Sequence, residues 1–302
     1  MAFTVENVAA EMAVVGESPV WDPASKMLYW TDIRSGRLFR FDPATGINET
    51  IHRGAHVGGL AINRHGGLVL GTWEGVMLWR SDADWQWWRH DPEHGRQLQF
   101  NDCKAGPDGS FYAGSYYEGD PRGRLYRFHP SGEIEVVAEN LGISNGMGWS
   151  PDLTVFYHTD SLTRTIYRHE YDAVRHTLSN RTEFVKLPST LGVPDGMTVD
   201  ADGHVWSAIW GSGRVIRFDP EGNEELRIEF PATQTSSVMF GGAALTDIYV
   251  TSAMTGTGEP PSGMEPAGYD FTAHRGGGLY RVQQAEFAGK PEFEAALPWR
   301  RS

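Results

Sequence analysis

Short apolar segments alternate with polar turns along the chain, and no stretch holds a helical period of useful length. The turns carry Asp, Pro, Gly and Asn, which suit tight connections between antiparallel strands. The apolar segments either alternate with polar residues or run continuously, as half-buried and fully buried strands do. The pattern therefore predicts an all-β protein.

One pattern recurs six times along the chain. A small apolar strand leads into a turn and a second strand. A loop and a third strand follow, and the third strand ends in an aromatic or aliphatic residue plus Arg. The period is roughly 40–50 residues, the range of four-stranded propeller blades. The copies begin at SPVWDPASKMLYWTD, GLAINRHGGLVLGT, CKAGPDGSFYAGS, GMGWSPDLTVFYHTD, GMTVDADGHVWSAIW and VMFGGAALTDIYVTS, and their third strands reach Arg40, Arg80, Arg127, Arg168, Arg217 and Arg281.

Six such copies predict a six-bladed β-propeller with four-stranded antiparallel blades around a central channel, as one domain over residues 1–302. A β-sandwich or a β-helix is the alternative. A β-helix needs much shorter coils, and a sandwich would not repeat one turn motif six times. The exposed edge of a blade must be paired or covered. We therefore expect residues 3–15 or residues 293–298 to supply the missing outer strand that closes the ring.

Bulk composition narrows the function classes. Hydrophobic residues make up 40% of the 302 residues and charged residues 22%, which is enough apolar material for a folded core. The net charge of −13 disfavours binding to nucleic acid. The single cysteine, Cys103, excludes an intrachain disulfide. We find no signal peptide and no transmembrane span, and we expect a cytoplasmic protein.

One position in each repeat is expected to face the channel. The innermost strand of every propeller blade lines the channel, so equivalent positions of the repeat form a ring. The six turns align on Asp22, Asn63, Gly106, Ser150, Asp200 and Gly241. Counting back five residues from each turn gives the ring positions Glu17, Gly58, Asn101, Asn145, Asp195 and Ser236.

Four of these ring positions carry an acid or an amide. Two carboxylates that meet in a channel repel each other, and a cation between them removes that cost. All the available donors are oxygens, which suits Ca²⁺, Mg²⁺ or Mn²⁺, and the absence of His and Cys from the ring disfavours a structural zinc site. Asn and Asp before Gly are also ordinary turn residues. Because all four fall at one phase of the repeat, we interpret them as a metal site.

These segments resemble the gluconolactonase/regucalcin (senescence marker protein) family of six-bladed propeller lactonases, over nearly the whole chain. Taken together the motifs are specific, although each alone is not. They are Gly16-Glu17-Ser18-Pro19, Asn101-Asp102, Ser144-Asn145-Gly146 with Ser150-Pro151-Asp152, Pro194-Asp195-Gly196-Met197, Tyr157-His158-Thr159-Asp160 and Phe240-Gly241-Gly242.

The resemblance implies the roles of several residues. It makes Glu17, Asn145 and Asp195 the protein ligands of one divalent ion (Ca²⁺, Zn²⁺, Mn²⁺, Mg²⁺ or Fe²⁺), and it places Asn101 against the metal-bound water or the substrate. The implied reaction is hydrolysis of a sugar lactone to its aldonic acid, with Asp195 as the candidate for steering or accepting a proton. Many members carry Arg where this chain has Gln99, and Gln brings no charge. This difference argues against gluconolactone as the particular substrate.

Further substrate contacts are expected from loops on the same face. The alternative reading for His158 is a hydrogen-bonded structural residue, and for Trp210 it is packing between blades. Residues 255–278 form a long Gly- and Pro-rich segment that either caps the channel or is a surface excursion. The candidate substrate contacts are Gln99, Asn101, Tyr116, Glu118, His158 and Trp210.

Two other functions remain open at the level of sequence. One is a non-catalytic propeller that binds calcium or a protein partner. The other is a related esterase that acts on another cyclic ester or an organophosphate, since the same Lewis-acid site would serve. The sequence gives no indication of the oligomeric state.

Overall fold

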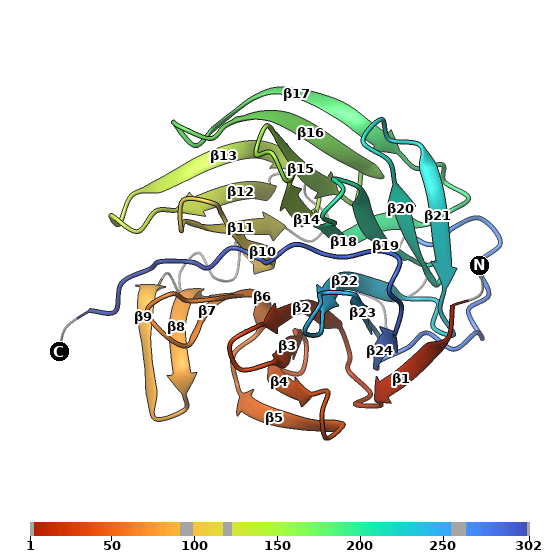
Figure 1. The fold of residues 1–302 in the computed structure, drawn as a ribbon, viewed down its shortest axis with the longest axis horizontal. Coiled ribbons are helices and arrows are strands. Elements are labelled where there is room, and N and C mark those ends of the chain that lie inside the picture. Colours follow the sequence, from red (N-terminus) through yellow and green to blue (C-terminus); the bar gives the residue numbers. More distant parts are fainter. Residues whose placement is uncertain (1–2, 91–98, 117–122, 255–263, 301–302) are drawn as a thin grey trace.

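A computed structural model describes residues 3–90, 99–116, 123–254 and 264–300. Its regular structure consists of six four-stranded antiparallel sheets, which Figure 1 shows arranged as blades around a central channel. This confirms the predicted all-β, six-bladed propeller. Within the described ranges, no helix is long and apolar enough to cross a membrane.

Each blade numbers its strands outward from the channel. Blade one holds β2 (Gly16–Asp22), β3 (Met27–Asp32), β4 (Arg37–Asp42) and β5 (Ile47–Arg53), and blade two holds β6 (Val57–Ile62), β7 (Leu68–Thr72), β8 (Gly75–Ser81) and β9 (Asp84–His90). Blade three holds β10 (Gln99–Ala105), β11 (Phe111–Tyr116), β12 (Gly123–Phe128) and β13 (Ile134–Leu141). Blade four holds β14 (Ser144–Trp149), β15 (Val155–Asp160), β16 (Thr165–Asp172) and β17 (Thr177–Lys186). Blade five holds β18 (Val193–Val199), β19 (Val205–Trp210), β20 (Arg214–Phe218) and β21 (Glu224–Glu229), and blade six holds β22 (Thr235–Gly241), β23 (Asp247–Ser252), β24 (Leu279–Val282) and β1 (Val5–Ala9).

The two ends of the chain share blade six. Strand β1 pairs antiparallel with β24, from Val5 opposite Val282 to Ala9 opposite Leu279. The N-terminal one of the two predicted segments therefore supplies the outer strand, and hydrogen bonds between the chain ends close the ring. The other segment, residues 293–298, has a different place.

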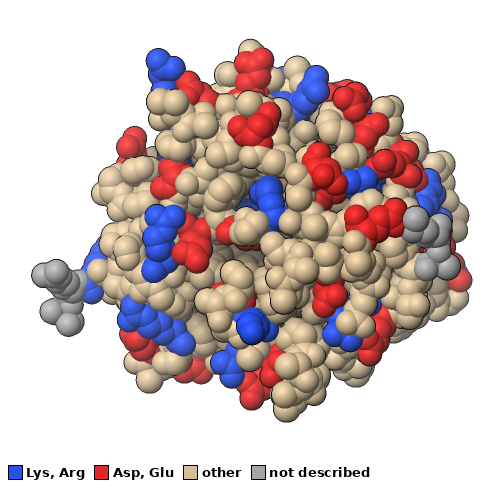
Figure 2. Space-filling view, viewed as in Figure 1, with Lys and Arg blue, Asp and Glu red and all other residues tan. Residues whose placement is uncertain are grey.

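Residues 287–299, which we call the C-terminal strap, cross the channel on the face that carries the turns between first and second strands. Figure 1 shows this blue segment passing over the centre of the ring, and Figure 2 shows the same face with acidic and basic side chains interspersed. Tail and turns are joined by backbone hydrogen bonds from Ala201 N to Ala288 O (2.9 Å), Gly289 N to Leu245 O (2.8 Å), Ala295 N to Ile62 O (2.9 Å) and Ala296 N to Gly109 O (2.7 Å). The strap thus closes one mouth of the channel.

The recurring Arg of the repeat has a structural role in two blades. In blade five, Arg217 Nε donates to Asp200 Oδ2 at 2.9 Å, and both side chains are at least 95% buried. In blade three, Arg127 Nη2 donates to Asp108 Oδ2 at 2.5 Å. Each pair ties the third strand to the turn after the first strand, so the Arg fixes the stacking of strands within its blade.

Candidate active site

All six inner strands are interrupted by a β-bulge at the predicted ring position. The register shifts between Glu17 and Val20 in blade one and between Pro194 and Met197 in blade five, for example. The other four shifts lie at Val57/Gly59, Phe100/Cys103, Ser144/Met147 and Thr235/Ser237. A bulge re-aims a side chain relative to a regular strand. The structure therefore confirms that the six positions are equivalent, while their role as ligands stays a prediction.

The two carboxylates of the predicted ligand set are buried, each with about 5% of its surface exposed. Burial, followed by the charges of Asp195 and Asp102, raises the pKa of Glu17 well above its usual range. Burial and the charge of Asp102 do the same to the pKa of Asp195. The mutual influence places Glu17, Asp102 and Asp195 near one another in the channel, where like charges oppose ionisation.

The amide of Asn145 is oriented by its neighbours. Asn145 Nδ2 donates to Ser161 Oγ at 3.1 Å, and Ser161 Oγ donates to the carbonyl oxygen of Pro194 at 2.7 Å. Asn145 Oδ1 is buried and has no hydrogen-bond partner among the described residues. Asn145 also contacts the Asp195 carboxylate and partly offsets the rise in the pKa of Asp195. A buried acceptor without a partner is costly, so this oxygen points to a missing electrophile.

The donor chemistry fits a divalent cation. Two buried carboxylates that repel each other and an unpaired amide oxygen form a set of hard oxygen ligands, the kind that Ca²⁺, Mg²⁺ and Mn²⁺ prefer. In the described ranges, no group of three or more His, Cys, Asp and Glu side chains forms a metal cage. The set of Glu17, Asn145 and Asp195 combines two acids with an amide and lies outside that definition.

The remaining ring positions join neighbouring blades. Asn101 Nδ2 donates to the carbonyl oxygen of Ser144 in blade four at 3.1 Å. Ser236 Oγ donates to the carbonyl oxygen of Gly16 in blade one at 2.5 Å. A side chain at Gly58 has no room, because its Cβ would lie 2.0 Å from a backbone oxygen of blade three. One side of the ring therefore carries the ligand-type oxygens and the other holds the blades together.

The predicted substrate contacts lie in different surroundings. Gln99 is half-buried at the start of β10 and pairs in register with Tyr116. The side chain of Tyr116 and the whole of Glu118 lie outside the described residues. His158 is fully buried in β15, and its Nε2 lies 2.8 Å from Ser144 Oγ, which favours the alternative structural reading.

Trp210 ends β19 and is 4% exposed. It packs against Val193, Ala253 and Met264, which favours the packing reading. Met264 belongs to the long segment 255–278, so the described part of that segment covers Trp210 beside the ring. Residues 255–263 of the segment lie outside the described residues. Direct contact of Trp210 with a substrate stays a prediction.

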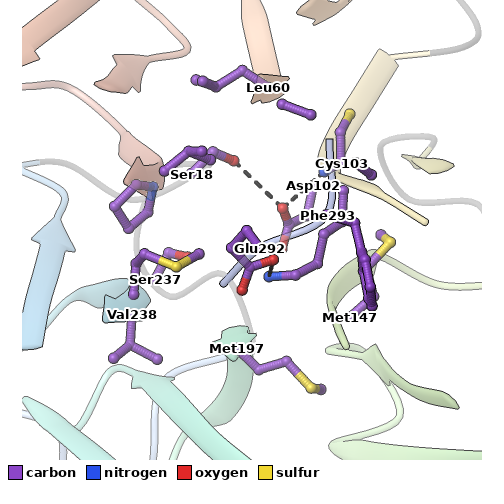
Figure 3. Close-up of a pocket in the computed structure, with 16 residues that line it drawn as sticks. Ser18, Leu60, Asp102, Cys103, Met147, Met197, Ser237, Val238, Glu292 and Phe293 are labelled. Carbon is purple, nitrogen blue, oxygen red and sulfur yellow. Dashed lines mark hydrogen bonds and ion pairs between the residues drawn. The ribbon is translucent and has the colours of Figure 1, made fainter. Parts of the chain in front are cut away.

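Three charged residues below the ring were missed at the sequence level. Asp102, Lys104 and Glu292 line an internal cavity of about 20 Å³, enough for roughly one water molecule. Figure 3 shows Asp102 and Glu292 in this space, with Ser18 hydrogen-bonded to Asp102. Asp102 and Lys104 share one face of β10, and this period of two was a usable signal. Glu292 lies in the C-terminal strap, outside the repeat, and had no such signal.

Comparison with known proteins identifies the family. Residues 15–254 match the model described as "SMP-30/Gluconolactonase/LRE-like region". Pentonolactonase XacC of Haloferax volcanii is 38% identical over 295 residues, covering 97% of this chain and 98% of that protein. Regucalcin of Xenopus laevis is 32% identical over 298 residues, covering 95% of this chain and 99% of that protein.

Among solved structures, that of the calcium-binding protein regucalcin from Agrobacterium tumefaciens superposes with a TM-score of 0.86. It covers 98% of this chain and 99% of that one at 24% identity, which supports the fold alone. The resemblance inferred from the motifs is thus confirmed by the family match and by two relatives above 30% identity. This chain belongs to the SMP-30/gluconolactonase/LRE-like family.

Proposed function

We propose that this protein hydrolyses a sugar lactone to the corresponding aldonic acid, using one divalent cation held by Glu17, Asn145 and Asp195. The observation that carries the proposal is the buried pair of carboxylates beside the unpaired Oδ1 of Asn145. A relative named pentonolactonase at 38% identity supports lactone hydrolysis as the class of reaction.

A cation in this position supplies a Lewis acid for the lactone carbonyl and lowers the pKa of a coordinated water. The chain holds the ligands rigidly. Ser18 N–H donates to Glu17 Oε2 at 2.9 Å, and Ser161 fixes the amide of Asn145. Asp195 is ionised in this arrangement and is a weak base while it binds the cation. We therefore assign Asp195 first to binding and only secondarily to steering a proton.

The likeness to calcium-binding regucalcin supports Ca²⁺ as the first ion to test, and the all-oxygen ligand set supports Mg²⁺ and Mn²⁺ next. Zn²⁺ and Fe²⁺ follow from the family resemblance alone. Gln99 offers hydrogen bonds without a charge. Together with the pentonolactonase relative, this favours a neutral five-carbon lactone over gluconolactone.

The test is acid release from a panel of aldonolactones and organophosphates, measured with chelator, without chelator and after each ion is restored. We expect hydrolysis of at least one aldonolactone that chelator abolishes and one ion restores. Turnover confined to organophosphates would support the related esterase. Calcium binding without any turnover would support the non-catalytic propeller instead.

The role of Asp195 is tested separately with Asp195→Asn. Full lactonase activity at equal metal content would remove any proton-transfer role for this carboxylate. Loss of activity together with loss of bound metal would support binding as its main role.

A further inference from the structure

The C-terminal strap contributes a charge to the interior of the channel. Glu292 Oε2 lies 3.1 Å from Lys104 Nζ, and the two side chains are only 12% and 11% exposed. Thr198 Oγ1 donates to Glu292 Oε1 at 3.3 Å. Burial alone would raise the pKa of Glu292, but the charges of Lys104 and Lys290 bring it below its usual range. Glu292 and Lys104 therefore form a buried ion pair.

This ion pair is connected to the ring through Asp102. Lys104 lowers and Glu292 raises the pKa of Asp102, which burial sets at about 6. Ser18 Oγ donates to Asp102 Oδ1 at 3.4 Å, and Ser18 N–H donates to Glu17 Oε2 at 2.9 Å. Figure 3 shows Ser18, Asp102 and Glu292 around one interior space. A continuous set of contacts thus runs from the strap to a predicted metal ligand.

We propose that the Lys104–Glu292 ion pair sets the cation affinity of the ring, so that the C-terminal strap is a functional part of the metal site. The ammonium of Lys104 opposes a cation above it, and the carboxylate of Glu292 offsets that ammonium. Neither residue is a ligand; both act through the field at Asp102 and the ring, as positioning residues. The inference rests on the proposed metal site.

The two charges have opposite predicted effects. Glu292→Gln leaves Lys104 uncompensated, so Ca²⁺ and Mn²⁺ bind more weakly. Lys104→Gln removes the opposing charge and leaves Glu292, so both ions bind more tightly. A unit charge about 10 Å from a divalent ion changes its binding constant by at least roughly tenfold, even at an effective dielectric constant of about 40. We therefore expect shifts of about tenfold in each direction.

The double variant Lys104→Gln/Glu292→Gln removes the whole pair and restores the net charge of the channel. Its affinity should return to within a few-fold of the wild-type value, which completes a double-mutant cycle. Glu294→Gln is the matched control, because Glu294 lies two residues further along the strap and makes only an exposed contact with Arg64 at 4.0 Å. We expect that control to bind both ions as the wild type does.

The assay is titration calorimetry of the chelator-treated full chain with Ca²⁺ or Mn²⁺ alone at pH 8, where Glu292 is ionised, with thermal unfolding as the measure of structural damage. Opposite shifts that cancel in the double variant would support the inference. Weaker binding in both single variants, or unchanged binding in both, would overturn it and leave the metal site standing. Wild-type protein that binds neither ion would overturn the metal site and this inference together.

Discussion

Replacement of Asp195 by Asn separates a metal ligand from a structural carboxylate. Without a cation, the ring holds Asp195 close to Glu17 and Asp102 in a buried space, and the pKa of Asp195 is raised. An unfolded Asp ionises near pH 4, so the destabilisation grows as the pH rises above that value. The amide removes this cost. Metal-free Asp195→Asn should therefore be more stable than the metal-free wild type at neutral pH.

The size of the effect follows from Coulomb's law. Two unit charges about 5 Å apart repel by roughly 3 kcal/mol at an effective dielectric constant of about 20. A chain of 302 residues has an unfolding entropy of roughly 0.6 kcal/mol/K, so 3 kcal/mol corresponds to about 5 °C. Ca²⁺ at a hundred times its dissociation constant adds roughly 2.7 kcal/mol, or about 4 °C, to the wild type. The variant should lose most of that second gain.

The assay is scanning calorimetry of both proteins at pH 7.5 and pH 4, each with chelator and with Ca²⁺. We expect the variant to melt about 5 °C higher than the wild type in chelator at pH 7.5, with no difference at pH 4. Asp202→Asn is the control, because Asp202 is 73% exposed and lies far from the ring in sequence. A metal-free variant that melts lower than the wild type, or that keeps the full Ca²⁺ response, would refute the reasoning.

Three further changes test the fold around the site. Burial, followed by the charge of Arg181, lowers the pKa of His169 to about 4, so the native state excludes a proton that the unfolded chain takes up near pH 6.5; His169→Gln should remove up to about 3 kcal/mol of the stability lost between pH 6.5 and pH 4, measured by urea unfolding, and an unchanged pH profile would contradict this. Asp200→Ala strands Arg217 in the core and should cost about 3–5 kcal/mol, or roughly 5–8 °C in Tm, whereas a loss under 1 kcal/mol would contradict a structural role for the pair. Gly58→Ala places a Cβ 2.0 Å from a backbone oxygen of the next blade and should destabilise the protein by about 1–3 kcal/mol in denaturant titration, and unchanged stability would show that the blades separate freely.

Periodicity made the fold and the ring predictable. The six turns occupy one phase of the repeat, and counting back from them locates all six bulges, including those at Glu17 and Asp195. The sequence did not decide which end of the chain closes the ring, because residues 3–15 and residues 293–298 both carry apolar residues that suit an outer strand. The pairing of β1 with β24 resolves this, and it depends on contacts between residues about 270 positions apart, which no local pattern encodes.

Chemistry that enters from outside the repeat could not be predicted. Glu292 belongs to a segment with no counterpart in the other blades, so nothing in its surroundings marked it as an interior residue. His158 and Trp210 were named for their position at the ends of second strands. That position does not reveal whether a side chain turns toward the channel or toward the adjacent blade, and the structure buries both. Side-chain direction at a strand end is a property of packing between blades.

The geometry of the ring is maintained by bonds between blades and does not require the cation. Ser18 Oγ donates to the carbonyl oxygen of Gly58 at 2.9 Å, which joins blades one and two. Equivalent bonds run from Asn101 to blade four, from Ser161 to blade five and from Ser236 to blade one. The ligand-type oxygens are thus held in place by their own neighbours while burial and repulsion oppose their charge. A site that is rigid and electrostatically unfavourable when empty gains the most from a cation, because little ordering remains to be done on binding.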